Sequence, residues 1–160
     1  MESDRCDSIG VIIEIEARQN YIIRKSVNLS KQIHIIASNI DQVFLIITIK
    51  TPQTFPTFID RFLSTAKAYE IKTILVFNKV DCYNPRELIE MRLMKSVYEQ
   101  IGYDCHEVVA TDLNTLVQIK KTMARKVNMF SGHSGVGKST LINTLSPGLG
   151  LKTGNISNQH

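Results

Sequence analysis

A glycine-rich pattern in the last third of the sequence sets the strongest limit on the fold. Residues 132–139 read Gly-His-Ser-Gly-Val-Gly-Lys-Ser, an intact G-x-x-x-x-G-K-S. A strand predicted over 127–130 precedes the pattern and helical spacing over 138–145 follows it, which is the strand–loop–helix context that the motif requires. We therefore expect a P-loop, in which backbone N–H groups and the positive end of a helix surround a chain of phosphates.

The side chains of this loop have separate expected roles. Lys138 is expected to reach the β- and γ-phosphates and to act with Ser139 in catalysis, and the Ser139 hydroxyl is expected to ligate Mg²⁺. The other residues expected to bind the phosphates are Gly132, His133, Ser134, Gly135, Val136, Gly137 and Thr140. For His133 we expect a backbone N–H and a surface contact, and not a catalytic base.

Apolar runs alternate with helical spacing along most of the chain. Buried strands are predicted over 43–49 and 73–77, further strands over 105–110 and 127–130, and helices over 58–69, 84–101, 113–122 and 138–145. Asn84, Pro85 and Glu87 form a capping-box pattern at the start of the second helix. Repeated β-α-β units predict an α/β fold, with a parallel-rich sheet and helices on both faces.

A second motif, Asn78-Lys79-Val80-Asp81, lies at the carboxyl end of the strand predicted over 73–77. The Asp81 carboxylate can accept from both the ring N–H and the exocyclic amine that guanine presents side by side, whereas adenine offers no such pair. Asn78 would tie this loop to the P-loop, and the Lys79 stem would lie over the base. Together the two motifs predict a site for a guanine nucleotide.

The order of the two motifs is unusual, because Asn78 precedes Gly132 by 54 residues. In ordinary GTP-binding domains the phosphate loop comes first, and circular permutation can reverse the order without changing the sheet. The chain thus resembles the circularly permuted GTPases, and within them the ribosome small-subunit-dependent GTPase family (RsgA, also YjeQ). The stretches 37–43, 77–81 and 131–143 carry the resemblance, which covers nearly all 160 residues.

The resemblance implies an N-terminal OB-fold, a permuted GTPase domain and a C-terminal zinc-binding domain. It also implies GTP hydrolysis stimulated by the 30S subunit during its late maturation, with GTP or GDP and Mg²⁺ bound. The implied partners are the 30S subunit and 16S rRNA, for a cytoplasmic monomer that touches no membrane. A third guanine-loop element would fall on residues 109–111, with Ala110 and Thr111 beside the base.

On that basis residues 1–37 would be the last β-strands of an OB-fold and residues 38–160 an incomplete permuted GTPase domain. Strands are predicted over 11–17, 21–25 and 33–37, which either pack on the following domain or end a small β-domain. The basic and aromatic side chains expected to form a nucleic-acid surface there, if they are not simply solvated, are Tyr21, Arg24, Lys25 and Lys31. His34 and His106 are expected to be ordinary strand residues.

The resembled family continues past residue 160 with a switch threonine, an Asp-x-Pro-Gly metal motif and a Cys/His zinc module. This sequence contains none of them, so it supplies no zinc ligands. We expect the parent protein to be a GTPase and this chain alone to be poorly active. Two alternatives stay open: a guanine-nucleotide-binding module without useful hydrolysis, and a basic RNA-binding fragment. Asp112 could replace the metal aspartate, but a helix cap is the favoured interpretation.

Charge and composition agree with this interpretation. Residues 113–160 carry six lysines and arginines with no acidic residue, whereas residues 1–112 carry 13 and 15. Such a segment suggests an anion site, although a solvated basic tail is the alternative. The apolar run over 43–49 is far shorter than the roughly 20 residues of a membrane span. From the polar N-terminus we expect no secretory signal, and three widely spaced cysteines indicate reduced thiols.

Overall fold

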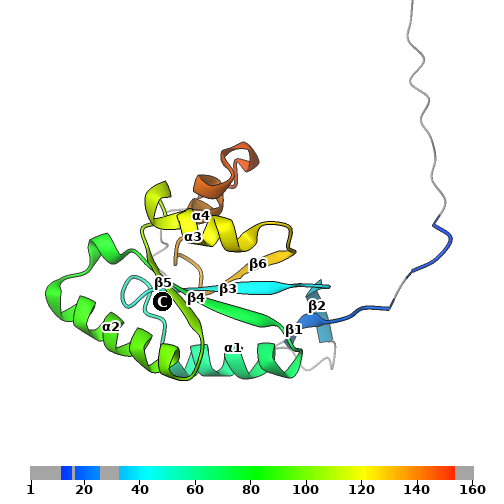
Figure 1. The fold of residues 1–160 in the computed structure, drawn as a ribbon, viewed down its shortest axis with the longest axis horizontal. Coiled ribbons are helices and arrows are strands. Elements are labelled where there is room, and N and C mark those ends of the chain that lie inside the picture. Colours follow the sequence, from blue (N-terminus) through cyan, green and yellow to red (C-terminus); the bar gives the residue numbers. More distant parts are fainter. Residues whose placement is uncertain (1–11, 16, 26–32, 154–160) are drawn as a thin grey trace, which may run out of the picture.

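The structure, a computed structural model, describes residues 12–15, 17–25 and 33–153 (Figure 1). Its strands are β1 (Tyr21–Lys25), β2 (Ile33–Ser38), β3 (Gln42–Ile47), β4 (Lys72–Asn78), β5 (Asp104–Val108) and β6 (Asn128–Ser131). Its α-helices are α1 (Pro56–Ala68), α2 (Pro85–Gln100), α3 (Leu113–Met123) and α4 (Lys138–Leu145). Short 3-10 turns span Val80–Cys82 and Pro147–Leu149.

Four parallel strands form the main sheet, in the order β5-β4-β3-β6. The side chains of β3 are buried along its whole length, as are those of β4 after its first residue. Both sequences are runs of β-branched, aliphatic and aromatic residues, which is typical of strands covered on both faces. Because all four strands run the same way, the segments that leave their C-terminal ends emerge at one edge of the sheet, here termed the carboxyl edge.

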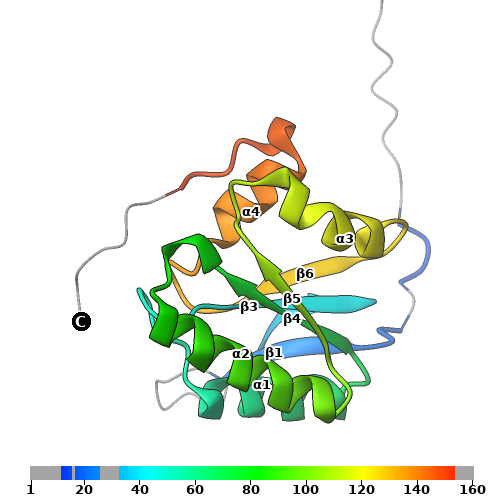
Figure 2. The same cartoon turned by 60° about the vertical axis from the view of Figure 1, so that its left-hand side comes forward.

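Helices cover both faces of this sheet, as predicted (Figure 2). Successive side chains of β3 point to opposite faces. Leu45 and Ile47 pack in a cluster with Ile59 of α1 and Met91 of α2. Phe44 belongs to a second cluster, in which Leu116 of α3 and Leu141 of α4 are also buried. The α/β fold with helices on both faces is therefore confirmed.

The first two strands form a separate antiparallel pair that packs against the domain containing the main sheet. Ile22 of β1 is buried in a cluster with Ile40, Val43 and other apolar side chains of that domain. The Asn20 side chain exchanges two hydrogen bonds with the backbone of Ile40, donating to its carbonyl oxygen at 2.9 Å and accepting from its N–H at 2.8 Å. The assignment of residues 1–37 to an OB-fold stays a prediction.

The strand predicted over 11–17 is wrong in the part that can be checked. Residues 12–15, 17 and 18 have no strand pairing, and Ile13 is 96% exposed. Alternating apolar residues form a strand only where a neighbouring strand pairs with them, and no described strand lies beside this segment. Val11, residue 16 and Lys31 are outside the described residues, and so are the side chains of Arg24 and Lys25.

Local signals account for the helix boundaries. The Asn84 side chain accepts hydrogen bonds from the N–H groups of Arg86 and Glu87, each at 3.0 Å, and the Glu87 carboxylate accepts from the Asn84 N–H at 2.9 Å. This is the predicted capping box, and it fixes the direction in which α2 leaves the carboxyl edge. Across the described residues, no helix combines the length and apolar character needed to cross a bilayer.

Candidate functional site

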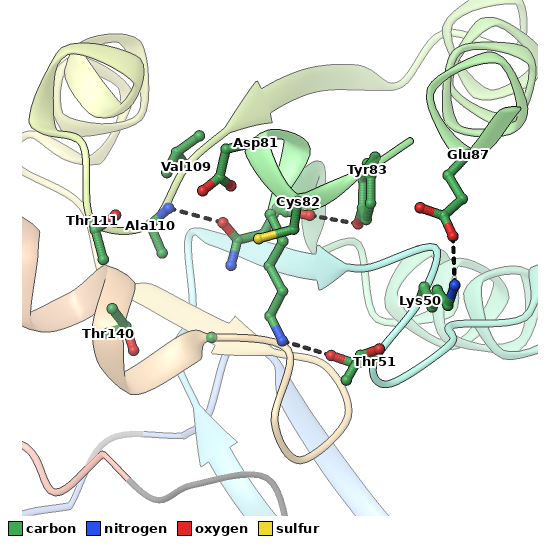
Figure 3. A pocket seen from close by; sticks show the side chains of 13 residues that line it. Lys50, Thr51, Asp81, Cys82, Tyr83, Glu87, Val109, Ala110, Thr111 and Thr140 are labelled. Carbon is green, nitrogen blue, oxygen red and sulfur yellow. Dashed lines mark hydrogen bonds and ion pairs between the residues drawn. The ribbon is translucent and has the colours of Figure 1, made fainter. Parts of the chain in front are cut away.

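Segments that follow β3, β4, β5 and β6 meet around one pocket at the carboxyl edge (Figure 3). The pocket has a volume of about 470 Å³, within the range of small-molecule sites. Its lining residues are Lys50, Thr51, Asn78, Lys79, Asp81, Cys82, Tyr83, Glu87, Val109, Ala110, Thr111, Gly137 and Thr140. The NKVD stretch, residues 109–111 and the end of the P-loop are thus brought together although they are far apart in sequence.

Asn78 holds these three segments in place. Its side chain is 1% exposed, and its amide nitrogen donates to the carbonyl oxygen of Val136 in the P-loop at 2.8 Å. Its amide oxygen accepts from the N–H of Ala110 at 2.9 Å. The structure therefore contains the link between the NKVD stretch and the P-loop that the sequence predicts.

Two P-loop glycines occupy positions that no other residue would fit. Gly137 has a φ of 99°, and a Cβ there would collide with the amide nitrogen of Asn78. Gly132 has a φ of 138°, and its Cβ would lie 2.5 Å from the carbonyl oxygen of Ile46. Both are positive-φ conformations that glycine adopts without strain. The result is a bare backbone turn before the N-terminus of α4, which is suited to a phosphate chain.

The ammonium groups of Lys138 and Lys79 both contact backbone carbonyls of the P-loop. Lys138 Nζ donates to the carbonyls of Gly132 at 2.8 Å and His133 at 2.5 Å. Lys79 Nζ donates to the carbonyls of Gly135 at 2.9 Å and Thr51 at 2.6 Å. Burial lowers the pKa of each lysine. Within the described residues neither amine forms an ion pair, so two positive charges remain available to an anion.

The His133 ring packs against Phe58 of α1, with ring centroids 4.0 Å apart. Burial lowers the pKa of the imidazole, and the nearby Lys138 ammonium lowers it further. A ring held neutral against an aromatic neighbour agrees with the surface contact expected for His133. Its backbone N–H belongs to the loop, where the expected phosphate contacts would form.

Ser139 and Thr140 begin α4 directly after the loop, and Thr140 also lines the pocket. Nowhere in the described chain do three His, Cys, Asp or Glu side chains gather in a way that could hold a metal. Mg²⁺, however, commonly binds one or two protein ligands together with phosphates and water, and a hydroxyl at the head of α4 fits that pattern. Asp112 caps α3 by accepting from the Asn114 N–H at 2.9 Å, which is the favoured interpretation.

Several pocket residues were not found from the sequence: Lys50, Thr51, Cys82, Tyr83 and Glu87. Lys50 and Thr51 come directly after the run over 43–49, and the rule that ligands bind beyond the carboxyl ends of parallel strands would have found them. Lys50 Nζ pairs with Glu87 at 2.8 Å, which holds this turn against the start of α2.

The family model and the similar proteins described here carry the same name. A family model described as RsgA GTPase matches residues 15–160. "Small ribosomal subunit biogenesis GTPase RsgA" of Christiangramia forsetii is 55% identical over 154 residues, covering 96% of this chain and 49% of the relative. The protein of the same name in Flavobacterium psychrophilum is 58% identical over 150 residues, covering 94% and 46%. The chain thus spans about half the length of the curated relatives it matches.

Solved structures give the same result. YjeQ from Thermotoga maritima superposes with a TM-score of 0.72 at 32% identity, over 87% of this chain and 46% of that one. YloQ, described as a circularly permuted GTPase, superposes with a TM-score of 0.70 at 30% identity, over 91% and 47%. The fold is therefore shared with these structures, in agreement with the reversed order of the two motifs.

Proposed function

The chain belongs to the RsgA GTPase family, and on that premise we propose that it forms the guanine-nucleotide-binding part of a GTP hydrolase that acts in maturation of the small ribosomal subunit. The observation that carries the proposal is the pair of hydrogen bonds made by the Asn78 side chain. They join the NKVD stretch to the P-loop and to Ala110 around one pocket. Groups suited to both the base and the phosphates of a nucleotide thus stand within the described chain.

Each end of the nucleotide has its own residues in this proposal. The backbone of residues 132–137 and the Lys138 ammonium bind the phosphates, which accept hydrogen bonds and positive charge. The Asp81 carboxylate accepts from the two guanine donors, while the backbone of Ala110 and Thr111 faces the base. The stem of Lys79 lies along the base, because its ammonium is already held at Gly135.

Hydrolysis of the terminal phosphate requires positioning and charge stabilisation more than covalent chemistry. Lys138 would move its hydrogen bonds from the loop carbonyls to the β- and γ-phosphates, where charge builds up. Ser139 is the one residue proposed to hold Mg²⁺, which would neutralise charge on the phosphate oxygens. The chain covers 49% of the length of its Christiangramia relative, so we assign activity to the full-length protein.

The proposed partners are the 30S subunit and its 16S rRNA, in the cytoplasm. Four exposed cationic residues lie where α3 ends and β6 begins: Lys120, Lys121, Arg125 and Lys126. None of them takes part in an ion pair within the described residues. They lie at the amino edge of the sheet, so contact with RNA phosphates there would leave the nucleotide pocket open.

A nucleotide titration tests the proposed site. We expect GDP to bind more than about tenfold tighter than ADP, because only guanine presents both donors to Asp81. Asp81→Ala should abolish this preference, and Lys138→Ala should weaken both nucleotides alike. Asp104→Ala removes an exposed carboxylate at the opposite edge of the sheet. It should change neither the preference for GDP nor the affinity for either nucleotide. Equal affinity for GDP and ADP in the unaltered protein would refute guanine recognition.

A second experiment tests the ribosomal role in the full-length protein. GTP turnover should rise when purified 30S subunits are added, and binding to the subunits should weaken steeply with salt. Replacing Lys121 and Arg125 together by Glu should reduce subunit binding while leaving GDP affinity unchanged. Absence of any 30S binding by the full-length protein would refute the proposed partner, but it would not contradict the proposed nucleotide site.

A further inference from the structure

The hydroxyl group of Tyr83 bridges the ends of two neighbouring strands at the carboxyl edge. It donates a hydrogen bond to the carbonyl oxygen of Asn78 at 2.6 Å, and it accepts one from the N–H of Ile49 at 2.9 Å. Asn78 is the last residue of β4, and Ile49 lies just beyond β3. One oxygen atom therefore satisfies a donor and an acceptor of the backbone where the two strands separate.

The hydrogen bond to Asn78 closes the NKVD stretch on itself. Residues 78–83 leave β4, pass through the left-handed residue Lys79 at φ 65° and the turn Val80–Cys82, and return to their own starting point through the Tyr83 side chain. Within this closed loop the Cys82 N–H also bonds to the Lys79 carbonyl at 3.0 Å. Asp81 stands on this loop with an exposed side chain, so the backbone of the loop decides where its carboxylate points.

The Tyr83 ring is itself firmly held. It packs against the apolar cluster formed by β3, β4, α1 and α2. Burial raises the pKa of its phenol to about 12, so the hydroxyl stays protonated and remains a donor to Asn78 near neutral pH. The start of α2 and the turn at Lys50 are joined beside it by the Lys50–Glu87 ion pair. The packed Tyr83 ring therefore holds the closed loop in place against the sheet.

We propose that Tyr83 is a positioning residue for guanine recognition, because its hydroxyl fixes the loop that carries Asp81. Guanine has to deliver its ring N–H and its exocyclic amine to one carboxylate at the same time. A small rotation of the loop would keep one of these hydrogen bonds and lose the other. The inference rests on the proposed nucleotide site and goes further by assigning part of its selectivity to a residue outside the motif.

Tyr83→Phe in the full-length protein is the direct test, because it removes one oxygen atom and keeps the ring in its cluster. The probes are GDP and inosine diphosphate (IDP), whose base keeps the ring N–H but lacks the exocyclic amine. GDP affinity should fall by roughly tenfold and IDP affinity by much less, as expected for a lost buried hydrogen bond. The GDP-to-IDP preference should therefore shrink.

Tyr98→Phe is the matched control. Tyr98 lies in the same apolar cluster, and its hydroxyl donates to the Asp60 carboxylate at 2.9 Å, away from the pocket. This variant should lower the melting temperature like Tyr83→Phe and leave the GDP-to-IDP preference unchanged. A change in selectivity at Tyr83 alone separates positioning from general stability.

A double-mutant cycle with Asp81→Ala completes the test. If Tyr83 acts through Asp81, adding Tyr83→Phe to Asp81→Ala should cause no further loss of GDP affinity. An unchanged GDP-to-IDP preference in Tyr83→Phe, or fully additive losses in the double variant, would overturn the inference. Failure of the unaltered protein to bind GDP would instead refute the proposed function.

Discussion

The side-chain amide of Asn78 donates a hydrogen bond to the carbonyl oxygen of Val136, which lies 58 residues later in the chain. The other end of the same amide accepts from the Ala110 N–H. Both polar ends of a buried side chain therefore have a backbone partner. Because this side chain links the NKVD stretch to two other segments of the pocket, Asn78 is the first position to test.

Asn78→Asp should destabilise the protein by about 2 to 4 kcal/mol and weaken nucleotide binding. The new side chain has the same shape, but it can no longer donate to Val136 and would bury a negative charge against a carbonyl oxygen. Urea denaturation gives the stability change. Asn114→Asp makes the same change in the exposed first turn of α3, where negative charge is favourable, and should be neutral. Similar losses at both positions would contradict the role of burial.

Gly137→Ala should lower stability by about 1 to 3 kcal/mol and abolish nucleotide binding. Its φ is positive, and the added methyl would collide with the Asn78 amide. Gly148→Ala is the control, because a Cβ there meets no atom within 4 Å and its φ is not positive. Thermal melts with and without GDP measure both effects. Retained GDP binding in Gly137→Ala would show that the P-loop can rearrange.

Asp112→Ala should lower stability by about 1 kcal/mol, since α3 loses its N-cap, while the Mg²⁺ dependence of nucleotide binding stays the same. Asp112→Asn keeps a capping oxygen and should restore most of the stability. Titrating MgCl₂ at constant GDP distinguishes a cap from a metal ligand. A shifted Mg²⁺ requirement in both variants would instead support Asp112 as a metal ligand.

Stability should fall as the pH is lowered through about 6.5. Burial lowers the pKa of His106 below its ordinary value of 6.5, with Asp104 opposing the shift and Lys95 adding to it. The unfolded chain therefore takes up a proton that the folded protein does not, which favours unfolding as the pH falls. Denaturation at about pH 7.5 and about pH 5.5 should show the loss, and His106→Gln should reduce it. If His106→Gln loses as much stability between the two pH values as the unaltered protein, the effect belongs to other groups, such as His133.

The sheet could be predicted from sequence because burial on both faces leaves a direct mark on composition. The runs over 43–47 in β3 and 74–77 in β4 are continuously apolar, and Asn84 with Glu87 marked the start of α2 by a local hydrogen-bond pattern. The strand expected over 11–17 failed for the opposite reason. Alternation shows that a segment is able to pair, but it cannot show that a neighbouring strand is present.

The site was predictable only where a motif is short and contiguous. Asn78, Asp81 and the P-loop carry their chemistry in adjacent residues, so they could be found by pattern. Tyr83 could not, because its hydroxyl matters through the carbonyl of Asn78 and the N–H of Ile49. Those two groups become neighbours only once β3 and β4 have paired.

Strand β3 has its two neighbours at very different distances along the chain. Gln42 pairs with Lys72 on one side and with Asn128, 86 residues later, on the other. During synthesis β3 and β4 can pair early, but one side of β3 keeps a row of free backbone groups until β6 leaves the ribosome. The nascent chain is therefore exposed to mispairing while residues 48–127 are being translated, and the same late strand that closes this edge delivers the phosphate loop.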